Sequence, residues 1–101
     1  MVPPILATLT WLTEKEGGRK TPVKSGYRTV IRFPNKDGVK EYWSAMITFV
    51  GHEGWLCPGE TANASLFFLS YHTVIEMLKV GMEIEVCEGH RCVAKGQVTA
   101  L

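Results

Sequence analysis

The residues of this 101-residue chain that could hold a metal ion gather mainly near its C-terminal end. Cys87, His90 and Cys92 lie close together, and His52 and Cys57 could complete a set of four ligands. Structural zinc sites, however, usually take their cysteines in closely spaced pairs on tight turns. Cys87 and Cys92 instead flank a four-residue turn and would face each other across a hairpin. The spacing favours two small apolar strand residues that stay reduced, so we expect neither a metal nor a disulfide.

The other titratable residues do not form a catalytic pattern. A nucleophile needs a base within hydrogen-bond reach and a third group that orients the base. His52, His72 and His90 are scattered over loop-like stretches without a recognisable catalytic motif. Glu83 and Glu85 alternate with apolar residues, which is typical of the solvent-facing side of a strand. We therefore expect a protein that is not an enzyme and carries no cofactor.

Residues 16–28, EGGRKTPVKSGYR, concentrate glycine and positive charge. The segment lacks the G-x-x-x-x-G-K-[ST] order of a phosphate loop, and it precedes a strand where a phosphate loop would open a helix. Nucleotide hydrolysis is therefore disfavoured. The cations of the segment could still meet the phosphates of an RNA backbone, and they are Arg19, Lys20, Lys24 and Arg28.

The glycines of the same segment have a structural interpretation. Gly17, Gly18 and Gly26 are expected to supply backbone conformations or close approaches that a bulky residue resists. They would shape a loop that aims Arg19 outward and delivers Tyr27 into the next strand.

Aromatic rings could also bind RNA by stacking on unpaired bases, and the candidates are Trp43, Trp55, Phe67 and Phe68. In the strands of a small barrel such rings belong more often to the core. Trp55 follows Gly54 in a turn-rich stretch, so it is the ring that we expect to be exposed.

The elements that must position these residues are almost all strands. Alternation of branched and aromatic residues predicts strands at 5–13, 27–33, 39–50, 61–71, 82–87 and 92–101. Residues 72–80 fit either one helical turn or a loop, and Gly81 would end a helix there. Six or so short strands predict an all-β fold, a small barrel or a sandwich, with a single domain over residues 1–101.

Composition is consistent with this single domain. Hydrophobic residues make up 46% of the chain, enough for a core without disulfides, and the net charge is only +1. Any binding of nucleic acid must therefore come from a local patch. Three cysteines favour a reducing compartment, and the N-terminus resembles neither a signal peptide nor a membrane span. We expect a cytoplasmic protein without a membrane partner.

Several motifs occur in an order known from one protein family. They are EGGRKTP at 16–22, GYR at 26–28, PGE at 58–60 and the run GMEIEVCEGHRCVAKGQV at 81–98. Together they resemble the C-terminal β-barrel domain, the third domain, of elongation factor Tu. The resemblance covers about residues 6–101, and it implies a small closed antiparallel β-barrel of about six strands.

The chain also departs from the family pattern. These 101 residues contain no counterpart of the family's GTPase domain or second barrel, so we do not expect the switch that gates tRNA delivery to operate within them. Segments 34–57 and 60–80 are longer than in the family. Cys87 replaces an arginine, His90 a glycine and Val30 a polar residue.

In the family this domain contacts the T-stem backbone of aminoacyl-tRNA, packs on the GTPase domain and meets the nucleotide-exchange factor. The resemblance implies that Arg19 and Gly89 approach the tRNA backbone. Lys20 stands in place of a family histidine and could meet a phosphate.

Two functions follow from these observations. The first is a protein-interaction domain of the translation machinery, or a regulator, decoy or immunity-type partner that mimics the family's domain. Its partner would be a translation factor or a factor-targeting protein, with Trp55 among the contacts and a homodimer as a variant. The alternative is direct binding of the tRNA backbone through the basic loop 19–28. We rank it second because an exposed ion pair contributes only about 1 kcal/mol, and the family adds two further domains to this contact.

Overall fold

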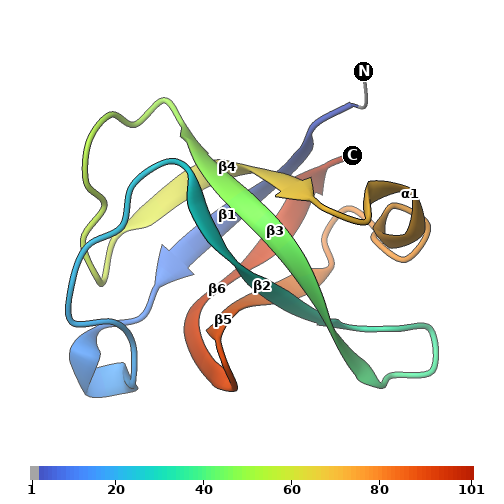
Figure 1. Ribbon diagram of the computed structural model, residues 1–101, viewed down its shortest axis with the longest axis horizontal. Coiled ribbons are helices and arrows are strands. Elements are labelled where there is room, and N and C mark those ends of the chain that lie inside the picture. The colour runs from blue at the N-terminus through green and yellow to red at the C-terminus, as the bar shows by residue number, and fades with distance from the viewer. Residues whose placement is uncertain (1–2) are drawn as a thin grey trace.

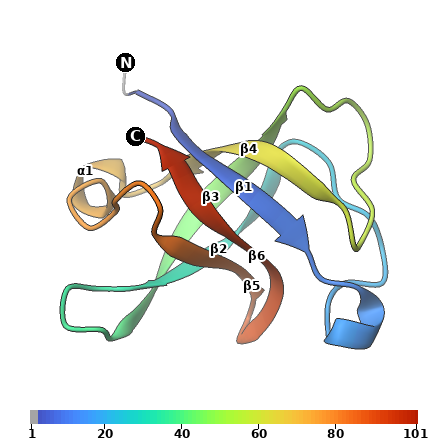
Figure 2. The same ribbon diagram turned by 180° about the vertical axis from the view of Figure 1, so that it is seen from behind.

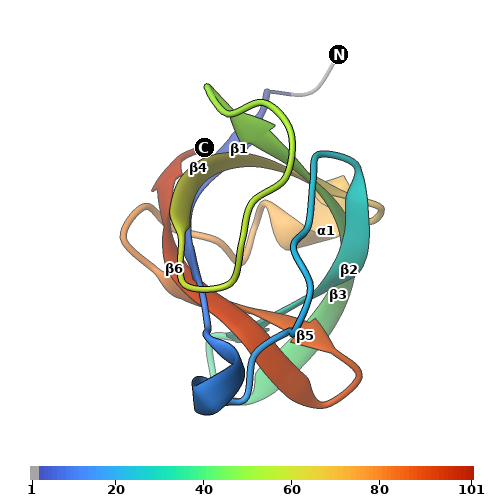
Figure 3. The ribbon, with the colours of Figure 1, turned by 90° about the vertical axis from the view of Figure 1, so that its left-hand side faces the viewer.

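Six strands arranged in a ring account for most of the computed structural model, which describes residues 3–101 (Figure 1). The strands are β1 (Ile5–Trp11), β2 (Tyr27–Pro34), β3 (Lys40–Val50), β4 (Thr61–Phe68), β5 (Glu83–Glu88) and β6 (Arg91–Ala100). They close a barrel in the order β1-β4-β3-β2-β5-β6, and all six neighbouring pairs are antiparallel. Figure 3 looks into the barrel, so that the strands form a ring around its interior. The predicted all-β fold with a closed six-stranded barrel is confirmed.

The core follows from the alternation of side chains along each strand. Ile5, Ala7, Leu9 and Trp11 of β1 all point inward and are buried, whereas the residues between them lie at or near the surface. The strands β1 and β6 lie side by side (Figure 2). A side chain at Gly96 of β6 would overlap the carbonyl oxygen of Thr8 in β1, so only glycine allows this close approach.

Two strands, β1 and β4, end two or three residues earlier than predicted, each for a local reason. After β1, Thr13 caps a 3-10 turn at Glu14–Glu16, and its side chain and backbone form a capping box with Glu16. After β4, the chain turns into α1 (Tyr71–Val74), which is a single helical turn that buries Val74. The helical alternative for residues 72–80 is confirmed only in part, because the turn covers Tyr71–Val74, residues 75–80 are turn or irregular chain, and Gly81 does not end the helix. Within residues 3–101, no helix has the length and apolar character needed to cross a membrane.

Candidate functional site

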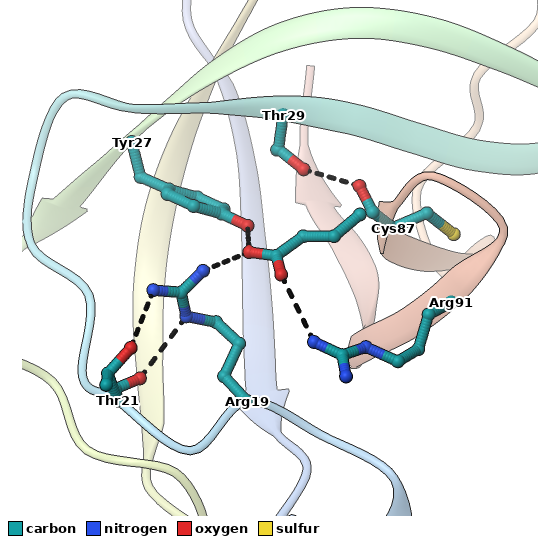
Figure 4. A network of polar contacts seen from close by, with 7 residues as sticks. Arg19, Thr21, Tyr27, Thr29, Cys87 and Arg91 are labelled. Carbon is teal, nitrogen blue, oxygen red and sulfur yellow. Dashed lines mark hydrogen bonds and ion pairs between the residues drawn. The ribbon is translucent and has the colours of Figure 1, made fainter.

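Arg19 is the centre of a polar network and does not point into solvent. Its guanidinium forms an ion pair with Glu88 and donates to the carbonyl and hydroxyl oxygens of Thr21 at 3.2 and 3.0 Å (Figure 4). It also lies 5.4 Å from the centre of the Tyr27 ring, and only 24% of the side chain is exposed. The prediction that the loop aims Arg19 outward is wrong, because an acidic partner on the β5–β6 hairpin holds it.

Glu88 joins three donors at the end of β5. The Tyr27 hydroxyl and the Arg19 guanidinium both donate to one carboxylate oxygen, and Arg91 lies 3.4 Å from the other. Burial alone would raise the pKa of Glu88, but the hydrogen bonds from Tyr27 and Arg19 outweigh it and the pKa is lowered. Burial, together with the bond to Glu88, raises the pKa of Tyr27 to about 12. The network fastens the basic loop to the barrel.

Two glycines give the loop the shape that reaches Glu88. Gly17 has a φ of 92°, which ends the 3-10 turn in a left-handed conformation. Gly18 is buried, and a Cβ there would overlap the carbonyl oxygen of Leu12. The predicted structural role of these glycines is confirmed.

The remaining predicted site residues are distributed over separate parts of the surface. Lys20 is exposed, with its nearest acidic partner, Glu14, at 3.9 Å. The Lys24 ammonium lies 4.9 Å from the ring centre of Trp55, whose exposed fraction of 58% confirms the prediction for this ring. Gly89 occupies the β5–β6 turn with a φ of 65°. Arg28 is exposed on β2 and forms no ion pair with any residue of the described range 3–101.

Arg28 borders a shallow apolar groove on the outside of the barrel. We call it the β2–β3–β4 groove; its volume is about 510 Å³ and it is lined by Arg28, Thr29, Val30, Ser44, Ala45, Met46, Phe67 and Leu69. The register of the strands arranges the outward side chains in two rows. One row runs from Arg28 through Met46 to Phe67, and the other from Val30 to Ser44, whose carbonyl accepts a bond from the Leu69 amide.

The groove exposes two large apolar side chains. Phe67 is 56% exposed and Leu69 is 82% exposed, whereas the neighbouring Phe68 is buried in the core. The expectation that Phe67 belongs to the core is wrong, because adjacent residues of a strand point to opposite faces. The Phe67-Phe68 pair was the available signal: once one ring is assigned to the core, the other must face outward.

A second ion-pair network lies beside the groove. The carboxylate of Glu85 accepts from Arg32 at 2.9 Å and from Lys40 at 2.8 Å, and Arg32 in turn reaches the Tyr42 hydroxyl at 3.2 Å. The hydrogen bond from Arg32, helped by Lys40, lowers the pKa of Glu85 to about 2. Glu85 lies on the outside of its strand, as predicted. Arg32 and Lys40 both use their charges to pair with it. These cations are therefore less available to a ligand than Arg28.

The cysteines and histidines form no common site. Cys87 and Cys92 face each other in the β5–β6 register, as predicted, although the turn between the strands has two residues and not four. Burial raises the pKa of both thiols, which lowers their reactivity. His52 lies 3.0 Å from the carbonyl oxygen of Trp55, and His90 packs edge-on against Tyr42. Over residues 3–101, no three His, Cys, Asp or Glu residues come together as metal ligands.

No family model matches the chain.

Proposed function

We propose that this protein is a non-catalytic, cytoplasmic protein-interaction module of the translation machinery, related to the third domain of elongation factor Tu. Its partner is a translation factor or a protein that targets such a factor. The β2–β3–β4 groove is the binding surface. The observation that carries the proposal is the exposure of Phe67 and Leu69 side by side in one groove.

Phe67 and Leu69 are not part of the packing that holds the barrel together. Its core is filled by buried residues from all six strands, and the ring of backbone hydrogen bonds is closed. Contiguous apolar surface on a small protein usually marks an interaction site. Buried aromatic side chains are the usual anchors of such interfaces, and Phe67 is placed to act as one.

A pull-down from cell lysate, treated with nuclease, tests the proposal. The protein should retain a stoichiometric protein partner after RNA has been digested. Recovery of the barrel alone, or loss of every partner on nuclease treatment, would contradict a protein-binding function. Recovery of only a second copy of this chain would reduce the function to homodimer formation.

Direct binding of the tRNA backbone is the second candidate, and one contact favours it. Lys24 stacks on the exposed Trp55 ring, and such a cation–aromatic pair is a common element of nucleic-acid surfaces. Lys20 and Arg28 are exposed cations on the same polypeptide segment. Arg19 contributes less than expected, because Glu88 already neutralises it.

Filter binding of tRNA at several salt concentrations tests this candidate. If Lys20, Lys24 and Arg28 each neutralise one phosphate, the log–log salt dependence should have a slope of about −2 to −3. The double substitution Lys20→Glu and Lys24→Glu should abolish retention. Arg19→Glu is a poor probe, because it would also break the ion pair with Glu88.

A further inference from the structure

Building on the proposed function, we infer that the β2–β3–β4 groove binds one amphipathic α-helix of the partner, with an acidic side chain of that helix opposite Arg28. The inference depends on the topology of the barrel, on the spacing of the two side-chain rows and on the charge of the groove.

The position of the groove argues against recognition of an extended peptide by strand addition. Strand addition needs an unpaired sheet edge, but the groove lies over a face of the sheet where β2 pairs with β3 and β3 with β4. A partner at the groove must therefore be recognised through side chains. A helix presents side chains while satisfying its own backbone groups, so it suits such a surface.

The spacing of the rows fits a helix that lies along β4. Phe67 lies on the outer face of β4, and Leu69 follows directly after the strand, where its amide still donates to the Ser44 carbonyl of β3. Two residues of extended chain span about 6.7 Å. Residues i and i+4 of a helix are about 6 Å apart along its axis. Across the groove, β4 and β2 are separated by β3, a distance of about 10 Å, which is close to the diameter of a helix. One helix can therefore cover both rows.

The charge of the groove selects the partner's chemistry. Arg28 is the single charged residue among those that line it, and no acidic residue of the described chain pairs with it. A covering surface without an acid would desolvate this guanidinium without compensation. An Asp or Glu beside the apolar stripe of the helix would form a charge-assisted pair with Arg28.

The same charge argues against a second copy of this chain and against RNA as the occupant. In a two-fold dimer through the groove, each copy would present the same surface, so Arg28 would meet no acid. RNA would place its charged backbone over Val30, Met46, Phe67 and Leu69, with a single cation to neutralise it.

Selection from a displayed library of helical peptides tests the inference without knowledge of the natural partner. The wild-type protein should enrich helices with apolar residues at i and i+4 and an adjacent Asp or Glu. Selected peptides should bind at least tenfold more weakly to Phe67→Lys, and equally well to the control Val80→Lys, which changes an exposed apolar residue outside the groove. Selection on Arg28→Glu should enrich basic helices instead.

Three results would overturn the inference: no enrichment, enrichment without a preference for acidic residues, or binding that Phe67→Lys leaves unchanged. None of them would by itself overturn the proposed function, because the pull-down detects a protein partner of any shape. Conversely, a pull-down without a protein partner would contradict the function whatever the library yields.

Discussion

The basic loop and the β2–β3–β4 groove differ in what their side chains contact: those of the loop contact the rest of the protein, and those of the groove contact solvent. In the loop, Arg19 is held by Glu88, Thr21 and Tyr27, so its charge stabilises the protein itself. In the groove, Phe67 and Leu69 contact solvent and Arg28 has no acidic partner in the described chain. The more conspicuous sequence motif is therefore part of the fold, whereas the less conspicuous face keeps its apolar side chains and its cation exposed.

The shape of the basic loop should depend more on Gly18 than on Gly17. Gly18→Ala places a Cβ against the Leu12 carbonyl, which is backbone and cannot rotate away, so we expect a loss of more than about 3 kcal/mol or a failure to fold. Gly17→Ala meets no atom and strains only φ, at a cost of about 1 kcal/mol. Urea unfolding of both variants measures the difference. Equal losses would show that the close approach does not shape the loop.

Removing the charge of Glu88 should release the loop from the barrel. Glu88→Gln weakens the bonds from Tyr27 and Arg19, and we expect a loss of about 1–3 kcal/mol of unfolding free energy. The matched control is Glu83→Gln, which changes an exposed glutamate on the same strand, and it should stay within about 0.5 kcal/mol. An equal effect of the two substitutions would show that the Glu88 network does not hold the loop to the barrel.

The ion pairs beside the groove should be sensitive to acid. Because the pKa of folded Glu85 is about 2 and its ordinary value is 4.5, its stabilisation is complete above 4.5 and is lost as the pH falls towards 2. After allowance for solvent screening, Glu85→Gln should be about 1–2 kcal/mol less stable than the wild type at pH 7. That difference should shrink when urea unfolding is repeated between pH 4.5 and pH 2.5. A difference that stays constant with pH would contradict the ion-pair origin.

The groove should tolerate substitution with almost no loss of stability. Phe67→Ala should change the unfolding free energy by less than about 0.5 kcal/mol, because more than half of the Phe67 side chain is exposed to solvent. Phe68→Ala, one residue further along, removes a buried ring and should cost about 3–5 kcal/mol. A large effect of Phe67→Ala on stability would mean that the ring belongs to the fold and is not kept for a partner.

The strands could be predicted because their alternation is local. The patterns at β1 and β2, and the roles of Gly17 and Gly18, depend on neighbours within a few residues. The ends of the strands were harder to predict. At the end of β1, for example, the alternation continues in the sequence, but Thr13 caps a 3-10 turn there.

The partners of charged residues could not be predicted in the same way. Arg19 and Glu88 are 69 residues apart and meet only because the barrel brings the loop to the β5–β6 hairpin. The groove likewise combines residues of β2, β3 and β4 that become neighbours only through the pairing registers of these strands. Alternation can place Phe67 on the outer face, but it does not show which residues lie beside it.

One measurement tests most directly whether the groove is the binding surface. Nuclease-treated lysate is passed over the wild-type protein, Phe67→Lys and Val80→Lys, and the retained partner is quantified. We expect Val80→Lys to retain as much partner as the wild type and Phe67→Lys to retain at least tenfold less. Equal retention by Phe67→Lys, in a variant shown to be folded, would contradict the assignment of the groove.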